Sequence, residues 1–453
     1  MALPLDLEEI QGTVLRNRPM PYFGAYLLFR IDDADAARRG IARLLPHVTS
    51  ARNWDAPAEQ SWINIVLTAE GLRRIGVPPE VVDGFPLPFV QGMAARRVFL
   101  GDVGDSDPSN WDWPHGGNGF HLGLFLMAQN EDARDAKLAI GHEAMRGLPG
   151  LRLLAHLNVG IPPTMREHFG YVDGLSRPFI EGEGGEPLPG QDVTKAGEFV
   201  LGYENELGHI ATGPGPEIFW KNGTFISIRK IRQNVGAFRR FLRDSADTPD
   251  GQELVAAKMM GRWRSGCPLA LSPDHDDPGI VADPLRRNDF RYREEDPDGR
   301  KTPVGSHIRR INPRDALDGT ISDARTHRLL RRGSAYGPLL PEGLYEEDGE
   351  DRGIVLALIN ADPARQFEFV QSQWINDGDF VGEGSRTDPI VGRRDLADDY
   401  AYPARPVRRR FKGLPDFTVV RGGEHVFLPS LSSLRWLTEL SGGIAATPRL
   451  VGT

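Results

Sequence analysis

Short apolar and aromatic runs alternate with amphipathic stretches in the first half of the chain, a pattern typical of strands followed by helices. Asp33 and Thr68 stand just after two of these runs, where their side chains can cap a following helix. Residues 92–116, rich in Gly, Asp, Ser and Trp, predict a long ordered loop. The pattern predicts strands at residues 23–31, 62–67 and 120–127, and helices from the Asp33 cap to residue 45, at 69–75 and at 130–145.

The second half of the chain repeats this rhythm. It predicts strands at 224–231 and 353–360, helices at 235–242, 363–374 and 430–440, and a hairpin-like strand pair at 420–428. Strand–helix units separated by further strands in both halves indicate an α+β fold of two duplicated ferredoxin-like modules. We expect the boundary in the Gly- and Pro-rich linker 208–216, which divides the chain into modules 1–211 and 212–453. The halves share no repeat at the residue level, so the duplication is inferred from topology.

Composition excludes several classes of protein. A hydrophobic content of 40% and a charged content of 26% over 453 residues are ordinary for a soluble globular protein with two or three core-sized units or one large duplicated domain. The net charge of −9 argues against general binding to nucleic acid or anionic membranes. The single cysteine, Cys267, excludes an intrachain disulfide and an iron–sulfur cluster held by cysteines of one chain.

The expected location is the cytoplasm. The first ten residues are acidic and amphipathic, and they lack the basic n-region and apolar core of a signal peptide. No uncharged apolar run approaches the ~20 residues that a membrane span requires. With one cysteine, the chain suits a reducing compartment.

Residues 302–314 place His307 among the guanidinium groups of Arg309, Arg310 and Arg314. A neutral imidazole can bind a metal or haem iron, and an arginine fork matches the two oxygens of a carboxylate. Haem b offers both an iron and two propionates. A loop histidine in a basic surface patch would produce the same residue pattern.

Two other stretches carry candidate chemistry. Asp173, in residues 169–174, fits a tight turn, where it could simply accept a hydrogen bond from its own backbone. Arg331 could equally belong to a basic helix end followed by glycine. Together with His307, however, they match what a haem peroxidase needs: an iron ligand, an acid–base for the peroxide proton and a fixed positive charge. Arg331 cannot be deprotonated, so proton transfer would fall to Asp173.

The element 170–174, the stretch 305–314 and the stretch 330–333 together resemble the dye-decolorizing peroxidases, in particular the larger bacterial members. The resemblance covers nearly the whole chain, and the order of its motifs is preserved. Each motif is weak by itself, whereas the ordered set is specific. The further matching stretches are 6–12, 92–96, 222–225, 261–266 with 276–278, and 366–371.

The resemblance implies two ferredoxin-like modules that sandwich haem b. It implies a peroxidase that reduces H₂O₂ and oxidises bulky aromatic or dye-like substrates through a ferryl intermediate. By this resemblance His307 is the axial ligand of the haem iron, Asp173 is the distal acid–base and Arg331 is the distal arginine. The expected partners are H₂O₂ and aromatic small-molecule reductants, with no nucleic acid and no membrane. A homo-oligomer is possible.

The resemblance also assigns residues around the cofactor. Arg314, and more weakly Arg309, would bind a haem propionate. Ile354 and Leu356 would form the apolar distal ceiling. The family usually gives the proximal histidine a carboxylate partner, for which Asp416 is a guess, with a structural aspartate as the alternative.

Other interpretations remain open. A non-catalytic haem storage, transport or iron-release protein could use the same pocket, and an α+β enzyme without haem is a third hypothesis. Tyr336, Trp263 and Trp374 could relay electrons to surface-bound substrates, or they could be core residues. The acidic run 274–277 could bind Mn²⁺ or be a solvated loop. The long polar insertions 274–299 and 377–412 are interpreted as solvated surface loops.

Overall fold

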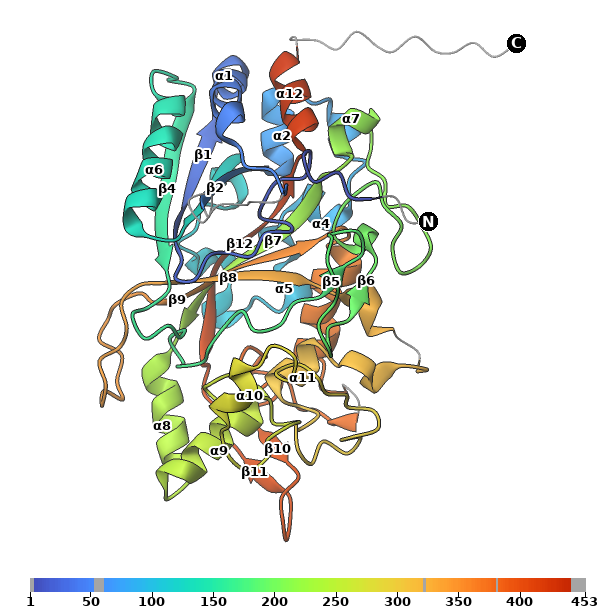
Figure 1. The fold of residues 1–453 in the computed structure, drawn as a ribbon. Helices are drawn as coiled ribbons and strands as arrows, with labels where there is room; N and C mark the ends of the chain where they lie inside the picture. Colours follow the sequence, from blue (N-terminus) through green and yellow to red (C-terminus); the bar gives the residue numbers. More distant parts are fainter. Residues whose placement is uncertain (1–3, 53–60, 321–322, 380–381, 441–453) are drawn as a thin grey trace.

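One antiparallel sheet forms the centre of the computed structural model, which describes residues 4–52, 61–320, 323–379 and 382–440 (Figure 1). Its strands lie in the order β4-β1-β3-β2-β12-β7-β9-β8. The first half of the chain supplies β1 (Phe23–Ile31), β2 (Ser61–Leu67), β3 (Leu122–Ala128) and β4 (Leu151–Gly160). The second half supplies β7 (Thr224–Gln233), β8 (Leu330–Tyr336), β9 (Gly353–Asn360) and β12 (Thr418–Leu428).

The sheet consists of two four-stranded halves with the same topology. If the strands of each half are numbered by their own order, both halves have the spatial order 4-1-3-2 of a ferredoxin-like module. The halves join where β2 pairs with β12, with Leu67 opposite Phe427. The predicted α+β fold with two ferredoxin-like modules is confirmed. The predicted boundary between residues 211 and 212 stays a prediction.

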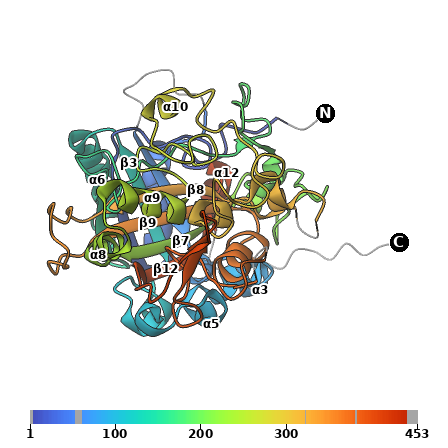
Figure 2. The same cartoon turned by 90° about the horizontal axis from the view of Figure 1, so that it is seen from below.

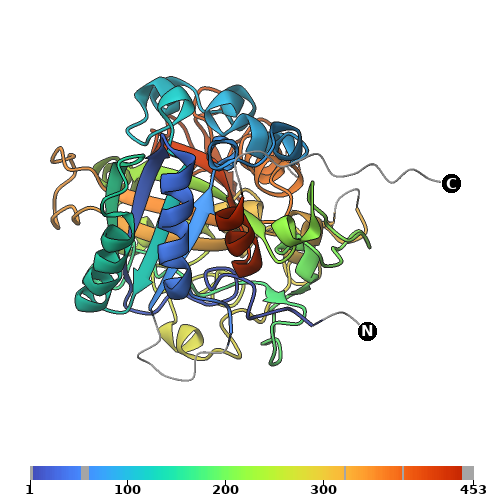
Figure 3. The same ribbon diagram turned by 90° about the horizontal axis from the view of Figure 1, so that it is seen from above.

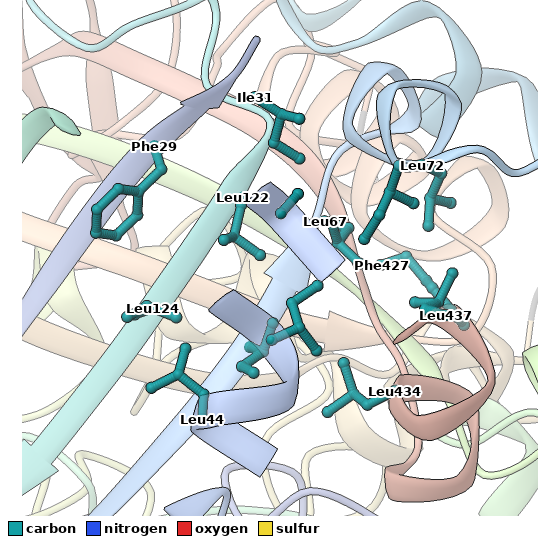
Figure 4. Packing of buried hydrophobic residues seen from close by; sticks show 14 of the residues in the cluster. Phe29, Ile31, Leu44, Leu67, Leu72, Leu122, Leu124, Phe427, Leu434 and Leu437 are labelled. Atoms are coloured by element: carbon teal, nitrogen blue, oxygen red, sulfur yellow. The ribbon is translucent and has the colours of Figure 1, made fainter. Parts of the chain in front are cut away.

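Helices cover one face of the N-terminal half of the sheet. The larger ones are α1 (Ala34–Leu44), α2 (Ala69–Ile75), α6 (Glu131–Met145) and α12 (Leu431–Glu439). Figure 3 shows α1 and α12 side by side over the strands, although the two helices come from opposite ends of the chain. Leucine side chains of these helices pack against the strands, including Leu44, Leu72, Leu434 and Leu437 (Figure 4). This core therefore ties α12, which comes from the second half of the chain, to the first module.

Each of these helices begins at a side chain that accepts a hydrogen bond from the first turn. Asp33 accepts from the backbone N–H of Ala36, and Thr68 accepts from that of Gly71. Asn130 and Ser430 do the same for α6 and α12. Such caps satisfy N–H groups that have no partner inside the helix, so the predicted helix starts are confirmed.

Several of the remaining elements lie around the C-terminal half of the sheet. Helices α8 to α11 and the small sheet β10–β11 gather at the end of the molecule away from α1 and α12 (Figures 1 and 2). The α-helices are α3 (Pro79–Val82), α4 (Leu87–Gln91), α5 (Arg97–Leu100), α7 (Glu217–Trp220), α8 (Val235–Ser245), α9 (Pro249–Met260), α10 (Pro278–Ala282) and α11 (His307–Ile311). The short strands are β5 (Phe179–Ile180), β6 (Val193–Thr194), β10 (Tyr400–Tyr402) and β11 (Arg409–Phe411). Two π-helical segments, Ala364–Glu368 and Val370–Ile375, occupy the predicted helix 363–374.

The predicted strand pair at 420–428 is wrong, because this segment belongs to the single long strand β12. The strand has a bulge, where the register against β7 shifts between Val420 and Gly422. A Cβ on Gly422 would lie 2.1 Å from the Cβ of Trp113, so close packing against the tryptophan explains the glycine. Arg331 likewise lies on strand β8 and not at a helix end.

In the part of the chain that the structure describes, no helix has the length and apolar character needed to cross a membrane. The cytoplasmic location stays a prediction.

Candidate active site

An apolar cavity of about 250 Å³ lies against the C-terminal half of the sheet. Alternate residues of a strand point to the same face, and Arg229, Ile231 and Gln233 of β7 all line this cavity. Ile354 and Leu356 of β9 line it as well. The other main contributors are α11, the second π-helical segment and the turn that contains Asp173, through His307, Ile308, Ile311, Val370, Gln371, Ile375, Val172 and Asp173.

The structure brings five of the predicted site residues together at this cavity. His307 begins α11, Asp173 lies in the turn after Gly170, and Arg331 lies on β8. These three line the cavity together with Ile354 and Leu356. Residues separated by more than a hundred positions in sequence therefore share one apolar space.

His307 is held by a buried carboxylate. Its Nδ1 lies 2.9 Å from Oδ2 of Asp388, which is fully buried. The other oxygen of Asp388 accepts hydrogen bonds from the backbone N–H groups of Ile390 and Val391, at 2.8 Å and 2.9 Å. Burial raises the pKa of Asp388, but the His307 ring and these N–H donors outweigh it and bring the pKa to about 2. An ionised acceptor at Nδ1 leaves Nε2 of His307 with a free lone pair.

The suggested partner of His307, Asp416, is wrong. Asp416 is exposed and lines a different cavity. The true partner lies in the insertion 377–412, which its Asp and Arg content made look like a solvated loop. The insertion buries Asp388 because its own backbone donors and His307 satisfy both carboxylate oxygens.

The Asp173 carboxylate forms ion pairs with two arginines, Arg331 and Arg18. Arg331 contacts both carboxylate oxygens, with Nη1 at 3.2 Å from Oδ2 and Nη2 bonded to Oδ1. Arg18 donates from Nη2 to Oδ2 at 2.8 Å. Burial raises the pKa of Asp173, but the two guanidinium groups outweigh it and hold the pKa far below its usual range. Asp173 also accepts from the N–H of Gly174 at 2.7 Å, so the expected tight turn is present too.

Arg18 was not predicted from the sequence, and neither was Glu167. Glu167 accepts hydrogen bonds from the backbone N–H groups of Phe169 and Tyr171 and from Nε2 of Gln233. Burial raises its pKa. These contacts fix the turn before Asp173 against strand β7, so Glu167 sets the position of the Asp173 backbone. A carboxylate a few residues before the turn is the only sequence signal, and it is weak.

Arg309 and Arg314 do not line the cavity. Arg309 donates to Asp296 and to the carbonyl of Thr302, and its guanidinium lies 4.3 Å from the ring centroid of Tyr292. Arg314 donates from Nη1 to three backbone carbonyls, those of Gly190, Asn288 and Phe290. The structure thus turns both guanidinium groups toward surrounding loops, which for Arg314 include a carbonyl of the first half, and does not bring them together with His307.

Two further cavities adjoin the first. Asp173 and Arg331 also line a polar cavity of about 470 Å³, which includes Arg18. A third cavity, of about 440 Å³, shares five lining residues with the first: Arg229, Ile231, Gln371, Val391 and Thr418. The apolar cavity therefore borders a larger space on each of two sides.

The candidate electron relays are buried. Tyr336 is 3% exposed, and its hydroxyl lies 3.2 Å from Oδ1 of Asp351. Trp263 lines the apolar cavity, and its indole N–H donates to the carbonyl of Ser272. Trp374 is also buried. All three are therefore packed in the core, as one of the two interpretations of these residues expects. That any of them relays electrons stays a prediction.

The acidic run 274–277 does not gather metal ligands. Asp277 caps α10 by accepting from the N–H of Gly279, and Asp276 bonds to the hydroxyl of Ser265. Over the described ranges, no group of three or more His, Cys, Asp and Glu side chains is placed to hold a metal ion.

Comparisons with curated proteins and with solved structures both find dye-decolorizing peroxidases. No family model matches the chain. The chain is 31% identical to Peroxidase 2 of Mycetinis scorodonius, over 95% of its own length and 87% of the relative. It is also 31% identical to a dye-decolorizing peroxidase of Mycena epipterygia, over 95% and 86% of the two chains. A solved dye-decolorizing peroxidase in complex with 2,6-dimethoxyphenol superposes with a TM-score of 0.83 at 27% identity, over 95% of this chain and 98% of the other.

Proposed function

Because the chain belongs to the dye-decolorizing peroxidases, a family of haem-dependent enzymes, we propose that His307, Asp173 and Arg331 form the site where it reduces H₂O₂ and oxidises aromatic compounds. The observation that carries the proposal is the convergence of these three side chains on one apolar cavity. Each comes from a different segment, and each offers a different function: a metal ligand, a proton carrier and a fixed positive charge.

The residues around the cavity fit haem b. His307 would hold the iron through Nε2, because its Nδ1 is engaged by Asp388. Ile354 and Leu356 offer apolar side chains to the macrocycle. When bound, the haem supplies the redox chemistry that cleaves the O–O bond of the peroxide.

Asp173 is the proposed proton carrier. Its pKa is held far below the usual range, so it stays ionised and able to accept a proton even in acid. It would take the proton from one peroxide oxygen and return it to the other, the oxygen that leaves as water. A low pKa makes the carboxylate a weak base and its protonated form a strong acid. This favours the return of the proton to the oxygen that leaves as water.

Arg331 and Arg18 would keep this carboxylate in place. Arg331 donates hydrogen bonds to both carboxylate oxygens of Asp173. It also lines the apolar cavity, where its fixed positive charge would hold the peroxide. Arg18 lines only the polar cavity on the other side. The two arginines would therefore have separate roles. Arg331 would contact the peroxide in the apolar cavity, and Arg18 would hold the Asp173 carboxylate through its hydrogen bond to Oδ2.

Peroxide-dependent oxidation of 2,6-dimethoxyphenol by the haem-loaded protein tests the proposal. We expect turnover that requires H₂O₂ and that falls strongly in Asp173→Asn. A protein that binds haem but shows no such turnover would instead support haem storage, transport or iron release. Asp192→Asn, at an ion pair with Arg328 outside the apolar cavity, is a matched control.

A further inference from the structure

Arg264 lies beside the turn that carries Asp173, although it comes from the segment after α9 in the second half of the chain. Its Nη1 donates a hydrogen bond to the backbone carbonyl of Phe169. Its own backbone carbonyl accepts one from the N–H of Val172 at 3.0 Å. Its guanidinium group also lies 5.2 Å from the ring centroid of Tyr171. One residue therefore contacts three of the four residues that precede Asp173.

The remaining residue of the four, Gly170, gives the arginine room. Its φ of +92° lies in the left-handed region, and a Cβ at this position would lie 2.7 Å from Nη1 of Arg264. The missing side chain lets the guanidinium group approach the backbone closely. A glycine also permits many other backbone conformations, so contacts from outside the turn are needed to keep this one.

Glu167 and Arg264 hold the turn through opposite kinds of backbone group. Glu167 accepts hydrogen bonds from two N–H groups, those of Phe169 and Tyr171. Arg264 donates to the carbonyl of Phe169, which lies between them. An ionised carboxylate can only accept and a guanidinium group can only donate, so neither residue can replace the other. Without Arg264, the peptide unit between Phe169 and Gly170 would lose the donor that fixes its orientation.

The charges that act directly on the Asp173 carboxylate belong to other residues. Arg331 and Arg18 bond to its two oxygens, whereas Arg264 bonds to the backbone four residues earlier. Nε of Arg264 also donates to Oε2 of Glu253 at 2.7 Å, so a carboxylate offsets its positive charge. The contacts of Arg264 therefore affect Asp173 through the position of the turn and not through charge.

We propose that Arg264 is a positioning residue for the peroxide reaction, because it keeps the Asp173 carboxylate where it can transfer the peroxide proton. A displacement of about 1 Å in a catalytic group can cost about 100-fold in rate, so the backbone that carries Asp173 must be held firmly. The inference rests on the proposed function, because that function makes Asp173 the proton carrier.

Arg264 can be reached from solvent. Its side chain is 23% exposed, and it lines a cavity of about 260 Å³ together with Arg239, Glu253, Glu342 and Tyr345. In Arg264→Ala a guanidinium ion from solution can therefore enter the space that the side chain leaves. The same ion offers the same planar set of N–H donors to the Phe169 carbonyl.

Two measurements on the Arg264→Ala holoprotein test the proposal. Amide hydrogen exchange in residues 167–173 should become at least about tenfold faster, because the turn opens more often. The reaction with H₂O₂ should slow at least about tenfold while the haem content stays the same. Guanidinium chloride, at a concentration too low to unfold the protein, should slow the exchange and raise the rate again. Potassium chloride at the same concentration should do neither.

Arg243→Ala is the matched control. Arg243, on α8, also forms an ion pair, with Asp244, and its guanidinium group also lies near a tyrosine, 4.7 Å from the ring centroid of Tyr345. This variant should exchange and react as the wild type does, with or without guanidinium. In Arg264→Ala, no change in exchange or rate, one change without the other, or changes that guanidinium does not reverse would each overturn the proposal.

Arg264→Lys covers the case in which Arg264→Ala fails to fold. Lysine keeps the charge but lacks the fork that reaches Phe169 and Glu253 together, so exchange should still be faster and the peroxide reaction slower than in the wild type. Wild-type values in this variant would contradict the proposal. The wild type itself separates the two levels. A normal wild-type reaction that the substitutions leave unchanged rejects only the positioning role, whereas a wild type that does not react with H₂O₂ rejects the proposed function.

Discussion

Oδ2 of Asp388 lies 2.9 Å from Nδ1 of His307, a residue 81 positions earlier in the chain. A carboxylate at this nitrogen makes the imidazole a stronger electron donor to a metal at Nε2. We therefore expect Asp388→Asn to make the reduction potential of bound haem more positive and to weaken haem binding by roughly 10- to 100-fold. A spectroelectrochemical titration measures the potential, and haem transfer to an acceptor protein measures the affinity.

Asp416→Asn is the matched control for that variant. Asp416 is the aspartate that the sequence suggested for this role, but it lies in the third cavity and not at His307. Its substitution should leave the potential unchanged. If both variants shifted the potential equally, the change would reflect general charge and not a partner of the histidine.

The contrast between Asp388 and His307 shows what the sequence could reveal. His307, Asp173 and Arg331 lie in short motifs whose order along the chain is itself a signal. Asp388 lies in a polar insertion, and its burial depends on backbone donors two and three residues later and on a histidine far away. Arg18 is equally hidden, because an arginine near the N-terminus has no pattern that points to Asp173.

The fold was predictable for a related reason. Strands such as β1 and β9 are nearly continuous apolar runs, and their predicted limits match the structure. Strand β8 contains two adjacent arginines, and β4 has many partly exposed positions, so neither shows a clear strand pattern. Tertiary pairing, β8 with β9 and β4 with β1, determines these two strands.

Arg331→Leu should keep the haem but slow the reaction with H₂O₂. The variant removes the fixed charge beside Asp173, and loss of one such donor typically costs about 10²- to 10³-fold in rate. Stopped-flow absorbance after mixing with H₂O₂ measures the effect. Arg325→Leu, at an exposed ion pair with Asp323, serves as a control and should react normally. An unaltered rate in Arg331→Leu would move the catalytic role to another residue.

Arg18→Gln should shift the pH dependence of the peroxide reaction. Asp173 has Arg18, Arg331, Tyr22 and Glu167 as its charged or titratable neighbours. Removing one of the two cations raises the pKa of Asp173 toward its usual value. The reaction needs the ionised carboxylate, so its rate falls as pH drops through this pKa, and the acid limb should move to higher pH. The rate of the peroxide reaction, measured from pH 2.5 to 7 in wild type and Arg18→Gln, tests this shift. An acid limb at the same pH in both proteins would show that Arg18 does not act through Asp173.

Glu424→Gln should change how stability depends on pH. Burial raises the pKa of Glu424 to about 7, despite hydrogen bonds from the backbone N–H groups of Met93 and His425. An unfolded glutamate ionises near pH 4.3, so the folded wild type loses stability relative to the unfolded chain as pH rises from about 4.5 to 7. The glutamine variant lacks this loss.

The free energy of unfolding of Glu424→Gln, relative to wild type, should therefore rise by roughly 3 kcal/mol between pH 4.5 and pH 7.5. Denaturant unfolding of both proteins at the two pH values, with equal haem loading, measures this difference. A difference that is the same at both pH values would mean that Glu424 is ionised in the folded protein across this range.

We propose that His307 holds the haem of this peroxidase. The most direct test is the absorption spectrum of wild type and His307→Ala after haem loading, recorded before and immediately after one equivalent of H₂O₂. We expect a Soret band in the wild type that changes rapidly with peroxide and returns when a phenol is added, and we expect His307→Ala to lose most of its haem. A His307→Ala protein with the same haem content and the same response to peroxide would contradict it.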